Sequence, residues 1–173
     1  ADLAKEFIEI RSYTGEEREL AVFVKNKMLE FGYDEAWIDE VGNVIGKIVG
    51  KKPGKKVLFD GHLDTVVVND TKAWKTNPFQ AVITDGKLYG RGATDMKAAL
   101  AAMIYAGALV AQNREYFAGE YYVSGTVHEE IAEGVSFRTV LTKVNPDLVI
   151  IGEASELKLN IGQRGRGEIL LET

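Results

Sequence analysis

The chain has 173 residues, about one domain's worth, with 46% hydrophobic residues and a net charge of −5 at pH 7. Lysine and arginine total 21 against 26 aspartate and glutamate residues, so there is no basic surplus to bind a nucleic-acid backbone. The absence of cysteine excludes disulfides, thiolate zinc sites and cysteine nucleophiles, and the only histidines are His62 and His128.

The first two predicted elements are helices. Apolar residues at helical spacing from Leu3 to Ile10 predict a short first helix. Thr14-x-x-Glu17 is typical of a capping box, in which the two side chains satisfy free amides at a helix start. We therefore expect a second helix that continues to Phe31 and is ended by Gly32.

Short apolar segments bounded by turn residues predict the strands. These strands are Ala36–Asp39, Val44–Val49, Val57–Phe59, Val82–Thr84, Lys87–Tyr89, Tyr121–Val127, Leu148–Ile151, Leu157–Ile161 and Glu168–Leu171. Asp85-Gly86 predicts a hairpin turn, and Lys51–Lys56 predicts a solvated turn. Further helices are expected over Ala93–Gln112 and Val135–Val144. Strands alternating with helices indicate a three-layer α/β/α domain with a mainly parallel central sheet.

No membrane-spanning or secretory segment is expected. The longest apolar run, Ala98 to Ala111, is shorter than the ~20 residues that span a bilayer. The N-terminus shows no charged-then-apolar leader, so we expect a cytoplasmic protein without a membrane partner. Because the chain lacks an initiator Met and stops at Thr173 directly after an apolar pattern, we also expect a longer parent protein.

Residues that can bind metals follow three of the predicted strands and open the long helix. Because the carboxyl ends of parallel strands meet at one edge of an open sheet, we expect these side chains to converge. The candidate cluster consists of His62 and Asp64 after Val57–Phe59, Asp95 at the start of the long helix, Glu129 and Glu130 after Tyr121–Val127, and Glu153 after Leu148–Ile151.

This many carboxylates raise one another's pKa unless a cation compensates them. One histidine with several carboxylates suits Zn²⁺, Mn²⁺ or Co²⁺. Two such ions sharing a carboxylate would lie ~3.5–4 Å apart and hold a hydroxide able to attack an amide. One carboxylate free of metal is then needed to move the proton.

Four motifs in order carry a resemblance to a known family: GHLDTV (61–66), GRGATDMK (90–97), HEEIAEG (128–134) and GEAS (152–155). They resemble the dizinc metallopeptidases that include glutamate carboxypeptidase, acetylornithine deacetylase, succinyl-diaminopimelate desuccinylase and the aminoacylases. VHEE and IGEASELKLNIGQRGRGE are most similar to the branch of selenium-metabolism hydrolases. The resemblance covers residues 1–173 as the N-terminal part of the catalytic domain, without the family's lid domain and final catalytic segment.

The resemblance implies two divalent metal ions, Zn²⁺ first with Co²⁺ or Mn²⁺ as alternatives. Asp95 would bridge both ions, with a cis peptide to Met96, and Glu129 would be the general base. Asp64 would hold the imidazole of His62. The remaining ligands would be His62 and Glu153 on the first metal, and Glu130 with a histidine further along the family's chain on the second.

The implied activity is cleavage of an amide bond in a peptide or N-acyl amino acid, by attack of a metal-bridging hydroxide. It would belong to the full-length parent, with this fragment inactive alone and a homodimer formed through the lid domain. His128 could fill the vacant second-metal position, although neighbouring strand residues point to opposite faces. The alternative is a non-catalytic metal-binding or structural module, against which the presence of Glu129 argues.

Overall fold

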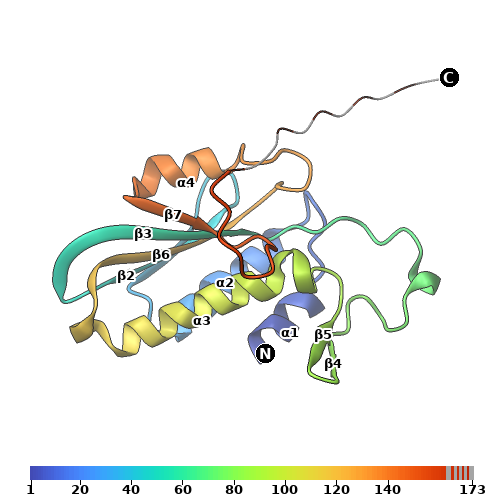
Figure 1. Ribbon diagram of the computed structural model, residues 1–173, viewed down its shortest axis with the longest axis horizontal. Helices are drawn as coiled ribbons and strands as arrows, with labels where there is room; N and C mark the ends of the chain where they lie inside the picture. Colours follow the sequence, from blue (N-terminus) through green and yellow to red (C-terminus); the bar gives the residue numbers. More distant parts are fainter. Residues whose placement is uncertain (163–164, 166, 168, 170, 172–173) are drawn as a thin grey trace.

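A five-stranded sheet forms the centre of the protein (Figure 1). The computed structural model describes residues 1–162 together with 165, 167, 169 and 171. The strand order is β1 (Glu35–Ile38), β2 (Val44–Val49), β6 (Ala118–Thr126), β3 (Lys52–His62) and β7 (Leu148–Ile151). Strand β3 pairs in parallel with β6 and β7, whereas β2 runs antiparallel to β1 and β6. All strands except β2 therefore point the same way, which confirms the predicted mainly parallel sheet.

Helices cover both faces of this sheet, which confirms the three layers (Figure 1). Helix α4 (Phe137–Val144) packs on one face through Val140 and Val144, within a small core that includes Leu58 and Tyr122. The other face holds the larger core, built from α1 (Asp2–Glu9), α2 (Arg18–Glu30) and α3 (Ala98–Gln112).

The smaller elements follow the predictions for the turns. Strands β4 (Val82–Thr84) and β5 (Lys87–Tyr89) form a separate hairpin, joined by Asp85 and Gly86 in left-handed conformations. Two short helical turns, η1 (Thr71–Ala73) and η3 (Arg114–Tyr116), lie in the connections.

The prediction of a capping box before α2 is wrong. Helix α2 begins after Glu17, and no side chain caps its N-terminus. The Thr14 hydroxyl donates instead to the Asp64 carboxylate, and the Glu17 carboxylate accepts from the main-chain amide of His128. Both side chains therefore form hydrogen bonds with residues distant in sequence, and neither caps the helix.

The predicted single helix over Ala93–Gln112 is interrupted at its start. Residues Ala93–Lys97 form an irregular turn, η2, with a cis peptide between Asp95 and Met96, as the family resemblance implied. By length and composition, Ala93–Gln112 would suffice to cross a membrane. In the structure, α3 instead packs in the main core through Leu100, Ala101 and Ile104, as expected for a core helix.

Two further predictions are wrong. Lys51–Lys56 is not a free turn, because β3 begins at Lys52 and pairs with β6 after a register shift between Lys52 and Lys56. Leu157–Ile161 forms no strand: its apolar side chains are almost fully exposed and no neighbouring strand pairs with them in the described part of the chain. The predicted strand Glu168–Leu171 includes residues outside those described.

Lys97 links η2 to the end of α1. Its side chain is buried, and its Nζ donates to the main-chain oxygens of Phe7 at 3.0 Å and Ile10 at 2.7 Å. These carbonyls lie at the C-terminal end of α1, where no further helical turn is present to satisfy them. Burial lowers the pKa of Lys97 to about 7. The lysine thus fixes the turn that carries Asp95 to the N-terminal helix.

Replacement of Lys97 by methionine should destabilise the protein by about 1–3 kcal/mol, because the variant fills the same space but removes the donor to the main-chain oxygens of Phe7 and Ile10. Urea unfolding measures the change. Lys87→Met, at an exposed position of the hairpin, is the control and should stay within about 0.5 kcal/mol of the wild type. Equal stability of the two variants would contradict a linking role for Lys97.

Candidate metal centre

His62 is the last residue of β3 and is almost fully buried. Its Nδ1 lies 2.8 Å from the main-chain oxygen of Asp64. Because a carbonyl oxygen can only accept a hydrogen bond, Nδ1 carries the proton. When the ring is neutral, its lone pair therefore lies on Nε2, which is the atom available to a metal.

Carboxylates from three other segments surround Nε2. The nearest oxygens are Asp95 Oδ1 at 2.8 Å, Glu153 Oε1 at 3.6 Å and Glu129 Oε2 at 3.9 Å. These residues come from η2, from the end of β7 and from the end of β6. The structure thus brings the candidates together at the carboxyl edge of the sheet, as the sequence predicted.

The donor atoms form two overlapping groups, each within 4.8 Å: His62, Asp95 and Glu130 in one, and His62, Glu129 and Glu153 in the other. The resemblance paired His62 and Asp95 with Glu153 instead. Asp95 Oδ1 and Glu153 Oε1 each lie within 4 Å of His62 Nε2, but these three donors do not form a group within 4.8 Å of one another among the described residues. The ligand set that the resemblance implies therefore stays a prediction.

Asp64 is fully buried and holds the segment that carries the two glutamates. Its Oδ1 accepts from the amide of Glu129 at 3.0 Å, and its Oδ2 accepts from the amide of Glu130 at 3.1 Å and from the hydroxyl of Thr14 at 2.8 Å. The same carboxylate is 3.6 Å from Nδ1 of His62. The main-chain oxygen of Asp64 therefore orients the imidazole, while its carboxylate fixes the following loop.

The three glutamates of the cluster have raised pKa values. Burial raises the pKa of Glu129, Glu130 and Glu153, and neighbouring carboxylates raise it further, partly offset by His62. Burial opposes protonation of His62, but its hydrogen bond to Asp95 and the surrounding carboxylates raise its pKa overall. A divalent cation would relieve this repulsion, and the nitrogen and oxygen donors present fit such an ion.

Two glycines let η2 lie directly against the ends of the strands. A Cβ on Gly61 would lie 2.6 Å from the Met96 Cε, and a Cβ on Gly152 would lie 2.8 Å from the Met103 Cε. These glycines precede His62 and Glu153. The contact between methionine side chains and strand backbone therefore sets how closely Asp95 approaches His62 and Glu153.

His128 belongs to neither donor group among the described residues. It adopts a left-handed conformation, and its Nδ1 lies 3.9 Å from Glu17 Oε1. Its side chain borders a cavity of about 450 Å³ that is also lined by Glu17, Arg18 and Glu40. The structure thus directs His128 toward α2 rather than toward the carboxylate cluster.

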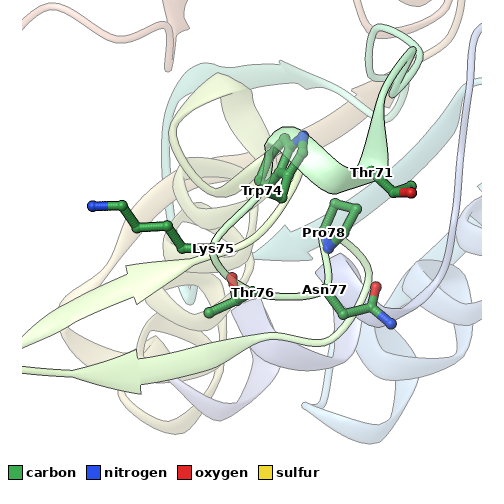
Figure 2. Close-up of a pocket in the computed structure, with 6 residues that line it drawn as sticks. All are labelled: Thr71, Trp74, Lys75, Thr76, Asn77 and Pro78. Atoms are coloured by element: carbon green, nitrogen blue, oxygen red, sulfur yellow. The ribbon is translucent and has the colours of Figure 1, made fainter.

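A second cavity, of about 480 Å³, lies within the connection between β3 and β4. Figure 2 shows its lining by Trp74, Lys75, Pro78 and their neighbours in residues 71–78. None of the candidate cluster residues lines it. The cavity and the cluster therefore share no residue.

Sequence reasoning missed Thr14 and Glu17 as supports of the cluster. The Thr-x-x-Glu pattern was visible, but it fits a helix cap equally well by spacing alone. Only the position of residues 128–130 in the fold shows that the two side chains support the cluster and do not cap the helix.

Solved structures with similar folds support the architecture. An M20 family metallo-carboxypeptidase from Sulfolobus solfataricus aligns with 86% of this chain and 36% of its own, with a TM-score of 0.76 and 24% identity. A tripeptidase from Staphylococcus aureus aligns with 89% of this chain and 42% of its own, with a TM-score of 0.71 and 24% identity. At these identities the likeness shows the fold.

Sequence relatives extend the comparison. Uncharacterised protein YgeY of Escherichia coli K12 is 31% identical over 97% of this chain and 42% of its own length. Succinyl-diaminopimelate desuccinylase 2 of Ruegeria sp. is 30% identical over 98% of this chain and 46% of its own. The chain thus spans less than half the length of these curated relatives. Residues 58–164, more than half of the chain, match the family described as Peptidase family M20/M25/M40, and the chain belongs to that family.

Proposed function

We propose that the protein containing these residues is a metal-dependent hydrolase that cleaves an amide bond in a peptide or an N-acyl amino acid. The convergence of His62 with Asp95, Glu129, Glu130 and Glu153 at one sheet edge carries this proposal. Membership of a peptidase family supports it. The proposal covers carboxypeptidase, deacetylase and desuccinylase types of the reaction and a cytoplasmic location, with activity in the full-length protein.

The proposed cofactor is a pair of divalent ions, Zn²⁺ first, with Co²⁺ or Mn²⁺ as alternatives. His62, Asp95 and Glu153 would hold one ion, and Asp95 with Glu130 would contribute to the second. When bound, such ions polarise a carbonyl group and lower the pKa of water.

Glu129 is assigned the movement of the proton. Its carboxylate is half-buried, and its Oε2 lies 3.9 Å from His62 Nε2, beside the proposed metal positions. A carboxylate left free of metal at this place suits a group that accepts a proton from water and returns it to the leaving nitrogen. Asp64 supports this role by fixing the main chain of Glu129.

The alternative proposal is a non-catalytic metal-binding or structural module of the same fold. Such a module would need the ligands but would have no use for Glu129 as a base. The two proposals therefore differ in what a change at Glu129 does.

In the full-length protein, Glu129→Gln should lower kcat on dipeptides and N-acyl amino acids by about 10²–10⁴-fold, because the amide cannot accept the proton. The metal content by elemental analysis should stay unchanged. Glu115→Gln, at an exposed position, is the control. Unchanged turnover in Glu129→Gln would refute the assignment of the base, and no turnover in the wild type would favour the structural module.

Asp95→Ala in the full-length protein should lose both ions, because the proposed bridging carboxylate contributes to each site. Elemental analysis after dialysis gives the number of ions per chain, with Asp2→Ala, exposed on α1, as the control. Retention of two ions in Asp95→Ala would exclude a bridging role.

Without metal, the protein should lose stability as the pH rises. Asp60 lies buried in β3 next to the cluster, where burial raises its pKa to about 7 from an ordinary value of 3.8. Because the folded state holds this proton more tightly than the unfolded state, the stabilisation is present at acidic pH and is lost as the pH rises through 7.

Urea unfolding in a chelating buffer at pH 5 and pH 8 tests this expectation against Asp60→Asn, which cannot titrate. The stability of the wild type relative to the variant should fall by roughly 1–3 kcal/mol between the two pH values. The stability of the wild type relative to Asp2→Asn, the control, should be the same at the two pH values. A constant difference between the wild type and Asp60→Asn would contradict the raised pKa.

A further inference from the structure

We propose that Glu17 and Thr14, in the turn before α2, are positioning residues for Glu129 and Glu130. This inference rests on the proposed function, because the support matters for catalysis only when Glu129 and Glu130 take part in the proposed reaction. The underlying contacts can be measured without any metal or substrate.

Three consecutive main-chain amides after β6 are held by two buried carboxylates. The amide of His128 donates to Glu17 Oε1 at 3.0 Å. The next two amides, of Glu129 and Glu130, donate to the two oxygens of Asp64 at 3.0 and 3.1 Å. At the point where the chain leaves the sheet, these amides thus donate to carboxylates instead of to a neighbouring strand.

The backbone at this point needs such support. His128 has a φ of 60°, a left-handed conformation that is unfavourable for a residue with a Cβ. The hydrogen bond from its amide to the Glu17 carboxylate helps to maintain this conformation. Glu17 therefore selects the backbone conformation from which Glu129 and Glu130 start.

Helix α2 does not account for the burial of Glu17. The Glu17 side chain is only 4% exposed, yet it makes no capping hydrogen bond to the helix. A carboxylate is removed from water at low cost only when donors reach it, and the donor here is the amide of His128. The burial of Glu17 thus serves the segment that carries the proposed base.

Thr14 acts on the same segment through Asp64. Its hydroxyl donates to Asp64 Oδ2, the oxygen that also accepts from the amide of Glu130. The turn itself is attached to the end of β3, because the Ser12 hydroxyl donates to the Leu63 oxygen and the Thr65 amide donates to the Ser12 oxygen. The turn before α2 therefore joins the segment of His62 and Asp64 to that of Glu129 and Glu130.

Amide hydrogen exchange by NMR on the metal-free 173-residue chain is the first test. In Glu17→Ala, the exchange of the His128 amide should accelerate by about 10–100-fold, the equivalent of one charge-assisted hydrogen bond. Glu17→Gln keeps an acceptor oxygen and should restore most of the protection. Glu19→Ala, exposed on α2, is the matched control and should match the wild type. Unchanged His128 exchange in Glu17→Ala would overturn the proposal.

The second test uses Co²⁺ bound to the full-length protein and the kinetics of hydrolysis. Glu17→Ala and Thr14→Val should alter the visible Co²⁺ spectrum and lower kcat by about tenfold, with KM nearly unchanged, because they misplace Glu129 and Glu130 without touching the substrate. Glu17→Gln should recover most of the kcat. Wild-type kcat and spectrum in both Glu17→Ala and Thr14→Val would overturn the positioning role.

The two tests separate this inference from the proposed function. A wild-type protein that neither binds Co²⁺ nor hydrolyses amides would remove the hydrolase proposal and, with it, the catalytic purpose of the support. Hydrolysis by the wild type, with unchanged kcat and Co²⁺ spectrum in both Glu17→Ala and Thr14→Val, would leave the hydrolase proposal standing and reject the positioning role alone. If Glu17→Ala fails to fold, Thr14→Val still decides, since it removes only the hydroxyl that donates to Asp64 Oδ2; wild-type kcat and Co²⁺ spectrum in that variant would then overturn the positioning role.

Discussion

The rest of the site depends on the hydrogen bonds accepted by the buried carboxylate of Asp64. Among the described residues it forms no ion pair with a lysine or arginine, and its compensation comes from two main-chain amides and one hydroxyl. Removing a carboxylate from water is costly unless such donors reach it. Since the donors belong to the turn before α2 and to the segment after β6, both must be in place before Asp64 can be buried favourably. The geometry of the cluster is therefore built into the fold.

Much of the fold could be predicted because its determinants are local. Strands such as Val44–Val49 and Leu148–Ile151 are apolar runs bounded by turn residues, and their observed limits are those expected. The cluster followed from a general property of parallel sheets, whose strands bring their carboxyl ends to one edge. The roles of the individual ligands came only from the family resemblance and remain predictions.

The predictions were wrong where a short sequence pattern forms its hydrogen bonds with distant residues or finds no partner to pair with. Thr14 and Glu17 have the spacing of a helix cap, but their hydrogen bonds go to Asp64 and His128. The alternation from Leu157 to Ile161 has the period of a strand. A strand must pair with a neighbouring strand, and the described residues provide none for this segment. The break within Ala93–Lys97 was not predicted, because its composition favours a continuous helix; the resemblance implied only the cis peptide between Asp95 and Met96.

The cluster draws its donor atoms from segments as far apart in the chain as His62 and Glu153, and this has a thermodynamic consequence. An unfolded chain cannot assemble such a set, so an ion that binds it binds the native state alone. Stability then becomes a function of the surroundings: above the dissociation constant, each tenfold rise in free ion adds about 1.4 kcal/mol to the free energy of unfolding. An ion bound there would act as a reversible cross-link, and its contribution to stability would depend on the concentration of free metal in the solution.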